Sequence, residues 1–166
     1  TDGLPDSVQQ ALAKRYADPA PADRRPLDRA YAEAMATAAR AFPGDDDIGA
    51  LYAESLMDLA PWAYWDERGQ PTEYTPRILA ALEGVLRRHP DHLGAAHYYI
   101  HATEASTAPG RAEPYADRLG ALAPGSGHLV HMPAHIYLRV GRYHDATLAN
   151  LSAGKADQAF LAACAH

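Results

Sequence analysis

The chain contains almost no cysteine and few large apolar residues. Its 166 residues include one cysteine, Cys164, together with two tryptophans and two phenylalanines. A single cysteine excludes a disulfide bond within the chain and is typical of a protein kept in a reducing cytoplasm. No apolar run approaches the roughly 18 residues that a membrane-spanning helix needs, and no charged-then-apolar leader opens the sequence. We therefore expect a cytoplasmic protein that has no membrane partner.

Basic residues are also in the minority. Fifteen lysines and arginines oppose 21 aspartates and glutamates, which gives a net charge of −6. The basic residues are scattered, whereas a protein that binds nucleic acid normally carries a concentrated positive patch. This balance argues against a nucleic-acid partner and against an anionic membrane surface.

The alanine-rich composition, poor in valine and isoleucine, predicts helices throughout. Pro43, Pro90 and Pro124 each close a helical run and are soon followed by glycine, aspartate or serine, which is typical of helix boundaries. No strand-like alternation interrupts the pattern, so we predict an all-α fold in one domain over residues 1–166. The sequence begins without methionine and ends in an apolar stretch, from which we expect a segment of a longer protein. The predicted helices cover residues 4–17, 26–42, 46–60, 74–89, 92–106, 110–122, 128–140 and 143–164.

Histidine is the residue type whose positions are most regular. His97 and His131 are 34 residues apart, and so are His101 and His135. Thirty-four residues is the period of the tetratricopeptide repeat, a helix–turn–helix unit that stacks into a solenoid. His97 and His101 are four residues apart, as are His131 and His135, so each pair lies on one face of its helix. Imidazoles at the same two places in consecutive units predict one shared surface with metal-binding or proton-transferring groups.

The segment that begins at Tyr137 resembles the core of a tetratricopeptide repeat. It has a large residue, a small one at the tight turn between helices, an aromatic residue and a small one where two helices touch, as Tyr137-x3-Gly141-x-Tyr143-x2-Ala146. Residues 97–101 and 127–137 are also similar to a histidine-rich group of bacterial repeat proteins of unknown role. The resemblance implies a solenoid of antiparallel helix pairs with about four units.

One unit is longer than the repeat period. Pro43 and Pro90, which close successive units, are 47 residues apart, 13 more than the period. We place the additional residues near 61–76, where Trp62 and Trp65 precede a turn-like sequence. This insertion is expected to leave the regular helices and to pack its tryptophans partly over a neighbouring element.

The resemblance further implies which residues face the inner, concave groove of the solenoid, because the first helix of each unit lines that groove. In the two units with paired histidines, the inward places hold imidazoles and one carboxylate: His97, His101, Glu104, His128, His131 and His135. Steps of three, four and seven residues keep each set within a narrow stripe of its helix. Neutral imidazole suits Zn, Cu and Fe, so these six residues are the predicted ligands of a transition metal ion whose identity stays open.

Four other residues are predicted to lie near the ion. Glu54 falls in the same repeat place as His101 and His135, and Asp58 lies one turn further along. These carboxylates are either ligands or partners that hold an imidazole in one tautomer, and a solvated acidic face is the plain alternative. Tyr98 and Tyr137 are the aromatic residues expected beside the ion.

Pro133 interrupts the predicted helix 128–140. Inside a helix, proline removes one hydrogen bond and clashes with the carbonyl group four residues earlier. Either the helix kinks at this point, or it begins near Met132 and leaves His128 and His131 in the preceding loop.

Two functions fit this pattern. The first is a metal-binding repeat protein, which would be an enzyme if its ion acts on a small molecule or peptide in the groove. The second is a non-enzymatic module that binds a peptide there, although such grooves commonly present lysine, arginine and asparagine. The spacing of His97 and His101 resembles half of the zinc-protease helix motif, but Tyr98 stands where that motif needs a glutamate. No residue triad defines a reaction, so catalysis, substrate and oligomeric state stay open.

Overall fold

The structure, a computed structural model, describes residues 5–164 of the chain. Within this range every regular element is helical, and the only β-type contact is an isolated bridge between Trp65 and Pro71. The all-α prediction is therefore confirmed, while Leu4 of the predicted first helix and His166 at the apolar end lie outside the described residues. The elements in chain order are α1 (Asp6–Lys14), α2 (Arg25–Ala41), α3 (Asp46–Met57), α4 (Thr75–Arg88), α5 (Leu93–Thr103), the 3-10 helix η1 (Pro109–Ala112), α6 (Glu113–Leu122), α7 (Gly127–His131), α8 (Pro133–Arg139) and α9 (Tyr143–Cys164).

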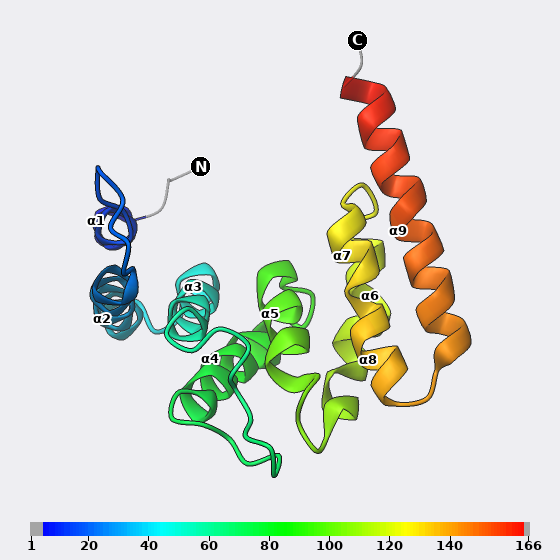
Figure 1. Cartoon of the computed structure of the whole chain (residues 1–166), viewed down its shortest axis with the longest axis horizontal. Helices are drawn as coiled ribbons and strands as arrows, with labels where there is room; N and C mark the ends of the chain where they lie inside the picture. Colours follow the sequence, from blue (N-terminus) through cyan, green and yellow to red (C-terminus); the bar gives the residue numbers. More distant parts are fainter. Residues whose placement is uncertain (1–4, 165–166) are drawn as a thin grey trace.

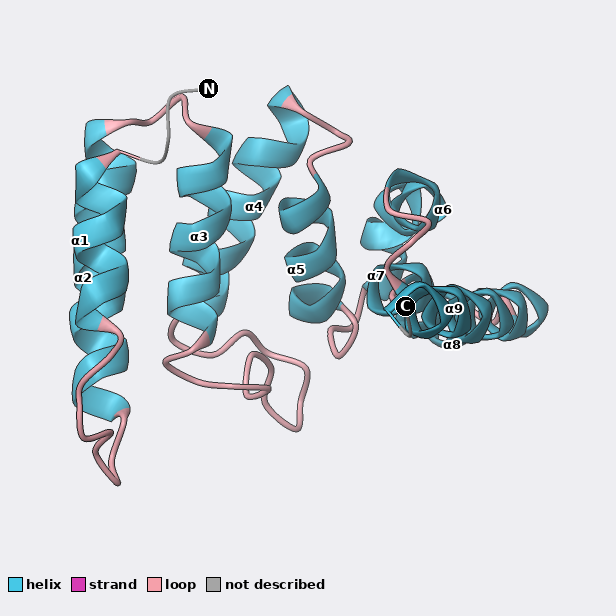
Figure 2. Ribbon diagram, turned by 90° about the horizontal axis from the view of Figure 1, so that it is seen from above, coloured by secondary structure: helices cyan, strands magenta, loops and turns pink. Residues whose placement is uncertain are grey.

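Each helix packs chiefly against its neighbours in the chain. Contacts join α1 to α2, α3 to α4, α5 to α6, and α9 to both α7 and α8. In addition α3 contacts α5, and α5 contacts α8, so these three helices follow one another along one side of the molecule. Figure 1 shows the helices as a row from α1 to α9, and Figure 2 shows α1 to α5 running in similar directions, with α8 and α9 beyond α5 and steeply inclined to them.

Helical periodicity produces the core. On α4, Ile78, Leu82 and Leu86 recur every four residues and are almost completely buried. Apolar residues at this spacing form one stripe of a helix, which packs inward. They belong to a large buried cluster that reaches from α2 to α9, and a smaller cluster joins α1, α2 and the start of α3. Within residues 5–164, none of the helices has the length and apolarity needed to cross a bilayer.

The predicted helix 128–140 is divided into α7 and α8 around Met132. Met132 itself keeps helical dihedral angles, with φ −50° and ψ −38°, so the chain kinks here and no loop intervenes. Pro133 has no N–H, and the hydrogen bond that would reach the carbonyl of Leu129 is therefore missing. The kink is the alternative that the structure adopts, and it leaves His128 and His131 within α7.

A tight turn joins α8 to α9. Gly141 has φ 84°, in the left-handed region that glycine occupies without steric cost. The N–H of Arg142 then donates to the carbonyl oxygen of Tyr137 at 2.8 Å, which satisfies the exposed end of α8 in the manner of a Schellman motif. The glycine thus has the turn position that the sequence pattern gave it.

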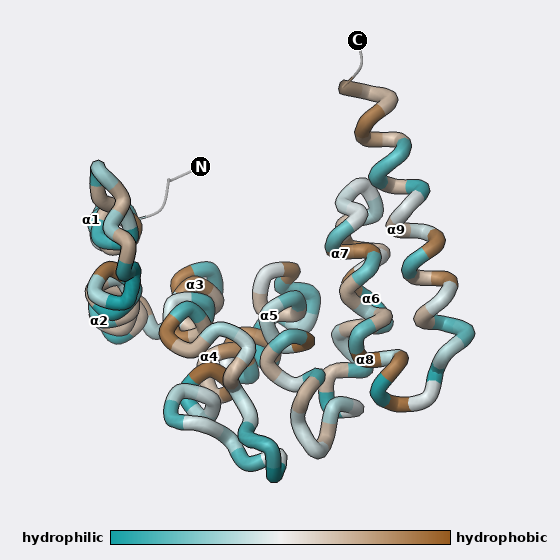
Figure 3. The backbone as a smooth tube through the Cα atoms, in the orientation of Figure 1, coloured by the Kyte–Doolittle hydropathy of each residue, from teal (hydrophilic) through white to brown (hydrophobic). Residues whose placement is uncertain are grey.

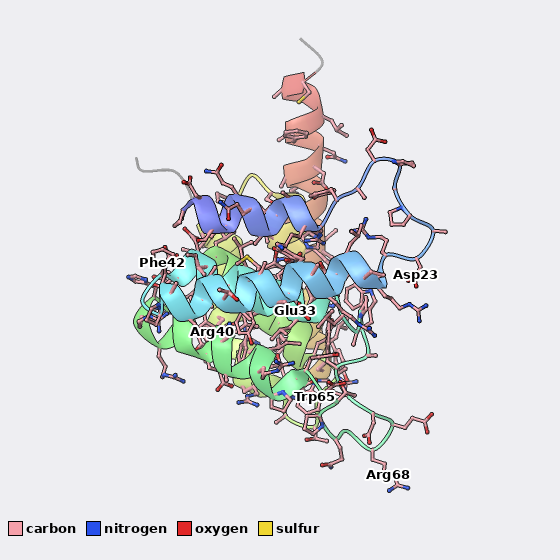
Figure 4. The ribbon with its side chains drawn as sticks, turned by 90° about the vertical axis from the view of Figure 1, so that its left-hand side faces the viewer. Asp23, Glu33, Arg40, Phe42, Trp65 and Arg68 are labelled. Carbon is pink, nitrogen blue, oxygen red and sulfur yellow. The ribbon has the colours of Figure 1, made fainter. Side chains whose placement is uncertain are left out.

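The segment between α3 and α4, residues 58–74, is irregular. Trp65 anchors it, because its Nε1–H donates to the carbonyl oxygen of Ala102 at the end of α5, at 2.8 Å. At its tip the Asp66 carboxylate accepts hydrogen bonds from the backbone N–H groups of Arg68 and Gln70. Figure 3 shows this tip as hydrophilic, and Figure 4 shows Arg68 far out on it, with Trp65 closer to the helices. One tryptophan therefore packs on a neighbouring helix, whereas Trp62 is 71% exposed.

Replacing Leu82 with alanine tests the core. Leu82 is fully buried, so Leu82→Ala should lower the free energy of unfolding by about 2–5 kcal/mol through lost burial and a residual cavity. Leu151 is 59% exposed, and Leu151→Ala should change the same quantity by less than about 0.5 kcal/mol. Denaturant titration followed by far-UV circular dichroism measures both. Equal losses in the two variants would contradict this description of the core.

Candidate metal centre

Five histidines lie together where α5 faces α7 and α8. His97 and His101 belong to α5, His128 and His131 to α7, and His135 to α8. We call these five residues the histidine cluster. The ring centroids of His97 and His101 are 5.0 Å apart, and those of His101 and His135 are 5.3 Å apart. Residues 104–126, which are 23 residues, separate α5 from α7 in the chain, and the fold brings the imidazoles of these helices into contact. Figure 1 shows α5, α7 and α8 as neighbours in the row.

The two faces of α5 explain how the cluster is presented. Ala95, Ala102 and the ring of Tyr99 are buried on one side and belong to the large core cluster. His97 and His101 occupy the other side and are only half-buried. Small side chains at a helix contact allow a close approach of the helix axes. The alanines thus allow α5 to pack closely against the core, while the imidazoles lie on its opposite side.

Two pairs of Nε2 atoms face each other across short distances. The Nε2 atoms of His131 and His135 are 2.9 Å apart, and those of His97 and His128 are 3.0 Å apart. An ion with bonds of about 2.1 Å separates its adjacent ligand atoms by about 3.0 Å at a right angle and about 3.4 Å in a tetrahedron. The observed separations are therefore close to those of ligands that share an ion.

The carboxylate of Glu104, directly after α5, fixes two of the rings. His135 donates its Nδ1–H to Glu104 Oε2 at 2.5 Å, and His101 donates its Nδ1–H to Oε1 at 3.1 Å. A neutral imidazole carries a single N–H, so both rings keep an unprotonated Nε2 atom. Metal-binding histidines typically donate their other N–H to a carboxylate in this way.

Asn150 on α9 accepts a hydrogen bond from a third imidazole ring, that of His131. His131 donates its Nδ1–H to the side-chain oxygen of Asn150 at 2.6 Å, which leaves the Nε2 atom of His131 unprotonated as well. If both rings are neutral, the 2.9 Å contact between His131 and His135 is then a contact between two nitrogen lone pairs. Such a contact is repulsive unless a metal cation or an additional proton lies between the two atoms.

Burial keeps part of the cluster neutral. Burial, together with the neighbouring imidazoles, lowers the pKa of His97 from 6.5 to about 4. The same two causes lower the pKa of His128. For Glu104, burial by itself would raise the pKa, but hydrogen bonds from His101 and His135 lower it to about 2. At neutral pH His97 and His128 are thus neutral and Glu104 is ionised, which are the forms that bind a metal.

Two overlapping sets of ligand atoms are close enough to hold an ion. His97, His101 and His128 form one set, and His101, Glu104 and His135 form the other, with ligand atoms within 4.8 Å of one another in each. His101 belongs to both sets and connects them. These sets contain five of the six predicted ligands, and His131 adjoins them through its 2.9 Å contact with His135. The oxygens of Glu104 contact Nδ1 atoms, which is the position of an orienting partner.

The two carboxylates expected near the ion have other partners. Arg15 lies between them, with its NH1 atom 2.5 Å from Glu54 Oε1 and its NH2 atom 2.6 Å from Asp58 Oδ2. Tyr31 donates its hydroxyl hydrogen to the other oxygen of Glu54 at 3.0 Å. Among the described residues neither carboxylate hydrogen-bonds to an imidazole, and both are paired with Arg15 instead.

The two predicted tyrosines differ in position. The ring of Tyr98 lies 5.0 Å from that of His97, beside the cluster as expected. Tyr137 does not approach the cluster, since its hydroxyl donates to Asp117 at 2.8 Å and Arg142 lies over its ring. Tyr137 follows His135 by two residues, which is a rotation of about 200° around the helix, so the two side chains point in opposite directions.

Three contributors to this region had no role in the sequence reasoning. Nothing local marks Asn150, because its contact with His131 depends on how α9 packs against α7. Tyr31 is likewise brought to Glu54 only by the packing of α2 against α3. A signal for Arg15 did exist, since Glu54 and Asp58 are four residues apart on one helix face and need a countercharge.

No protein-family model, curated protein or solved structure matches this chain. The geometry of the site itself must therefore carry the functional argument.

Replacing Asp58 with asparagine should change how stability depends on pH. Burial and the nearby charge of Glu54 raise the pKa of Asp58 from 3.8 to about 6, against the effect of Arg15. The folded chain thus holds this proton more tightly than the unfolded chain, and the wild type loses stability as the pH rises from about 4 to about 6. Relative to Asp58→Asn, this loss should amount to about 1–2 kcal/mol between pH 4 and pH 7.

Urea titrations of both proteins at several pH values measure this difference, and changes common to both proteins cancel. Asp47 is 75% exposed on the same helix, and Asp47→Asn serves as the matched control that should follow the wild type. If the wild type instead gained stability relative to Asp58→Asn between pH 4 and pH 7, the pKa of Asp58 would be lowered by folding and not raised.

Proposed function

We propose that this chain is a metal-binding protein whose histidine cluster holds a divalent first-row transition metal through imidazole Nε2 atoms. The single observation that carries the proposal is the 2.9 Å contact between the Nε2 atoms of His131 and His135. Glu104 and Asn150 accept the Nδ1–H groups of these rings, so both Nε2 atoms present lone pairs to each other. A shared cation turns this repulsive contact into a favourable one. An additional proton shared by the two Nε2 atoms would also relieve the repulsion. Direct measurement of the metal content distinguishes a bound metal ion from an additional proton.

The donor set narrows the choice of metal. Imidazoles with one nearby carboxylate and no thiolate suit Zn, Cu or Fe, while Mg and Ca prefer sites made of oxygen ligands. When bound with a coordination position open to water, such an ion supplies Lewis-acid chemistry and a metal-bound hydroxide near neutral pH. This would make the protein a metal-dependent enzyme, and the protein groups of the site would position the ion and its ligand.

The helix arrangement supports a tetratricopeptide-like architecture of about four units. The pairs would be α1 with α2, α3 with α4, α5 with α6, and α7–α8 with α9, each of which is in contact. The contacts of α3 with α5 and of α5 with α8 agree with first helices that line a common inner surface. On this proposal the histidine cluster lies on that inner surface, in the last two units.

The arrangement of the rings favours metal binding over a peptide-binding groove. A peptide-binding surface offers hydrogen-bond donors and acceptors that are separate from one another and directed outward. Here the Nε2 atoms of four histidines are directed at one another in pairs, at 2.9 and 3.0 Å. They are thus arranged around a small central object and not along an extended chain.

The first test removes two ligands from different helices. Protein purified without an affinity tag should contain at least one equivalent of Zn, Cu or Fe by elemental analysis, and His101→Ala/His135→Ala should lose it. Helical content by circular dichroism should be unchanged, because both side chains lie outside the apolar core. His89 and His144 are exposed, so His89→Ala/His144→Ala is the matched control that should keep its metal. Full metal content in the cluster variant would refute the proposal.

A second test separates an orienting carboxylate from a ligand. Glu104→Gln keeps one acceptor oxygen. It can therefore accept an Nδ1–H hydrogen bond from one imidazole, whereas the carboxylate accepts one from each of two. Loss of such a partner typically weakens metal affinity about 10–100-fold, without changing the ligands themselves. Competition with a chelator measures the affinity, and the visible spectrum of the Co²⁺-substituted protein reports the ligand set. A new Co²⁺ spectrum in Glu104→Gln would instead identify Glu104 as a ligand.

A further inference from the structure

A cavity adjoins the histidine cluster on the side of α3. Its volume is about 240 Å³, and it is bounded by α3, by the start of the segment 58–74 and by α5. This is smaller than the roughly 300–1,000 Å³ of pockets for drug-sized ligands, so a small molecule is the expected occupant. The side chains that matter for recognition are Glu54, Asp58, Trp62, Tyr64, Tyr98 and His101.

The wall of the cavity on α3 carries an excess of negative charge. Arg15 is the only guanidinium that pairs with Glu54 and Asp58 among the described residues, so two carboxylates share one positive charge. The nearby Arg24 is already paired with Asp28 at 3.5 Å and adds no free charge. Both oxygens of Glu54 are used, by Arg15 and Tyr31, whereas Asp58 pairs through Oδ2 alone. The second oxygen of Asp58 thus remains for a ligand.

Aromatic rings form much of the rest of the wall, together with Met57 and Pro61. The Trp62 ring lies edge-to-face on that of His101, with centroids 5.2 Å apart, although it is 71% exposed. Tyr98 borders the same cavity, and its hydroxyl has no hydrogen-bond partner among the described residues. By contrast, Tyr31, Tyr99 and Tyr137 each donate their hydroxyl hydrogen to a carboxylate.

Trp62 is held there by an unusual backbone. Its φ of 64° lies in the left-handed region, which is uncommon for a bulky residue and costs free energy. The neighbouring chain is anchored, since Trp65 bonds to Ala102 and both Thr72 and Thr75 bond to the carbonyl oxygen of Tyr64. A costly backbone that keeps a large ring in solvent at the edge of a cavity is the arrangement of a ligand wall.

We propose that this cavity binds a small organic cation, an ammonium group of an alkylamine or quaternary amine, between the rings of Trp62 and Tyr98 and the carboxylate of Asp58. Aromatic faces attract cations, most strongly the face of tryptophan, and the uncompensated carboxylate supplies the countercharge. His101 borders both the cavity and the histidine cluster, so the occupant lies next to the metal centre. The cation can be the substrate of the metal centre only if the function proposed above is correct. Binding of the cation to the cavity does not depend on that function.

Calorimetric titration of the full chain with tetramethylammonium chloride tests the proposal, first after metal removal with a chelator and then with Zn²⁺ added back. Saturable binding is expected in the metal-free protein, whereas tert-butanol of similar size and sodium chloride at equal ionic strength should show none. Trp62→Leu and Asp58→Asn should each weaken binding at least about tenfold. Phe160 is an exposed aromatic residue on α9 and Asp47 an exposed carboxylate on α3, so Phe160→Leu and Asp47→Asn are the matched controls that should bind normally.

Tetramethylammonium that binds no better than tert-butanol, or that binds Trp62→Leu as well as the wild type, overturns the proposal. Circular dichroism of each variant shows that it is folded, so that lost binding reports the cavity. Zn²⁺ binding without cation binding would refute the cavity and leave the metal centre in place. Cation binding in a chain that takes up no metal would support the cavity and refute the metal function.

Discussion

The site depends on one carboxylate that connects two helices. Glu104 follows the last residue of α5 and accepts an Nδ1–H group from His101 on its own helix and from His135 on α8. This sets the tautomer of both rings at once and directs their Nε2 atoms away from the carboxylate. Burial would oppose the charge, but the two hydrogen bonds lower the pKa of Glu104 to about 2, so it stays ionised. If this bridge were lost, α5 and α8 would have no polar link at the point where the imidazoles meet.

The two histidine pairs differ in geometry although their spacing in the sequence is equal. His97 and His101 lie four residues apart on the continuous helix α5, and their ring centroids are 5.0 Å apart. His131 and His135 have the same spacing but lie on either side of the break between α7 and α8, and their Nε2 atoms face each other at 2.9 Å. Equal spacing in the sequence thus gives one pair of rings that only touch and one pair whose nitrogens converge. Pro133 lies between the two histidines whose Nε2 atoms converge, and Asn150 and Glu104 orient their rings.

The chemistry changes along the row of helices. On α3, Arg15 and Tyr31 occupy both carboxylate oxygens of Glu54, whereas α5 and α8 carry histidines. Trp62 borders the same cavity as Glu54 and Asp58, and its ring contacts that of His101 in the histidine cluster. The proposed cation site and the histidine cluster therefore share a boundary. Because the irregular segment 58–74 is anchored at Trp65, this boundary has a fixed position beside α5.

Periodicity in the sequence was enough to predict helices nearly everywhere and to select the histidines of the cluster. Both predictions depend on local geometry, because a run of residues with helical spacing has one apolar stripe and one polar stripe. Only the tertiary structure decided between a kink and a loop at Pro133. It also determined the partners of Glu54 and Asp58, the roles of Asn150 and Arg15, and the outward direction of Tyr137. Each of these depends on side chains from helices that are far apart in the chain. Their relative rotation and distance follow from how the helices pack, which spacing within one helix does not specify.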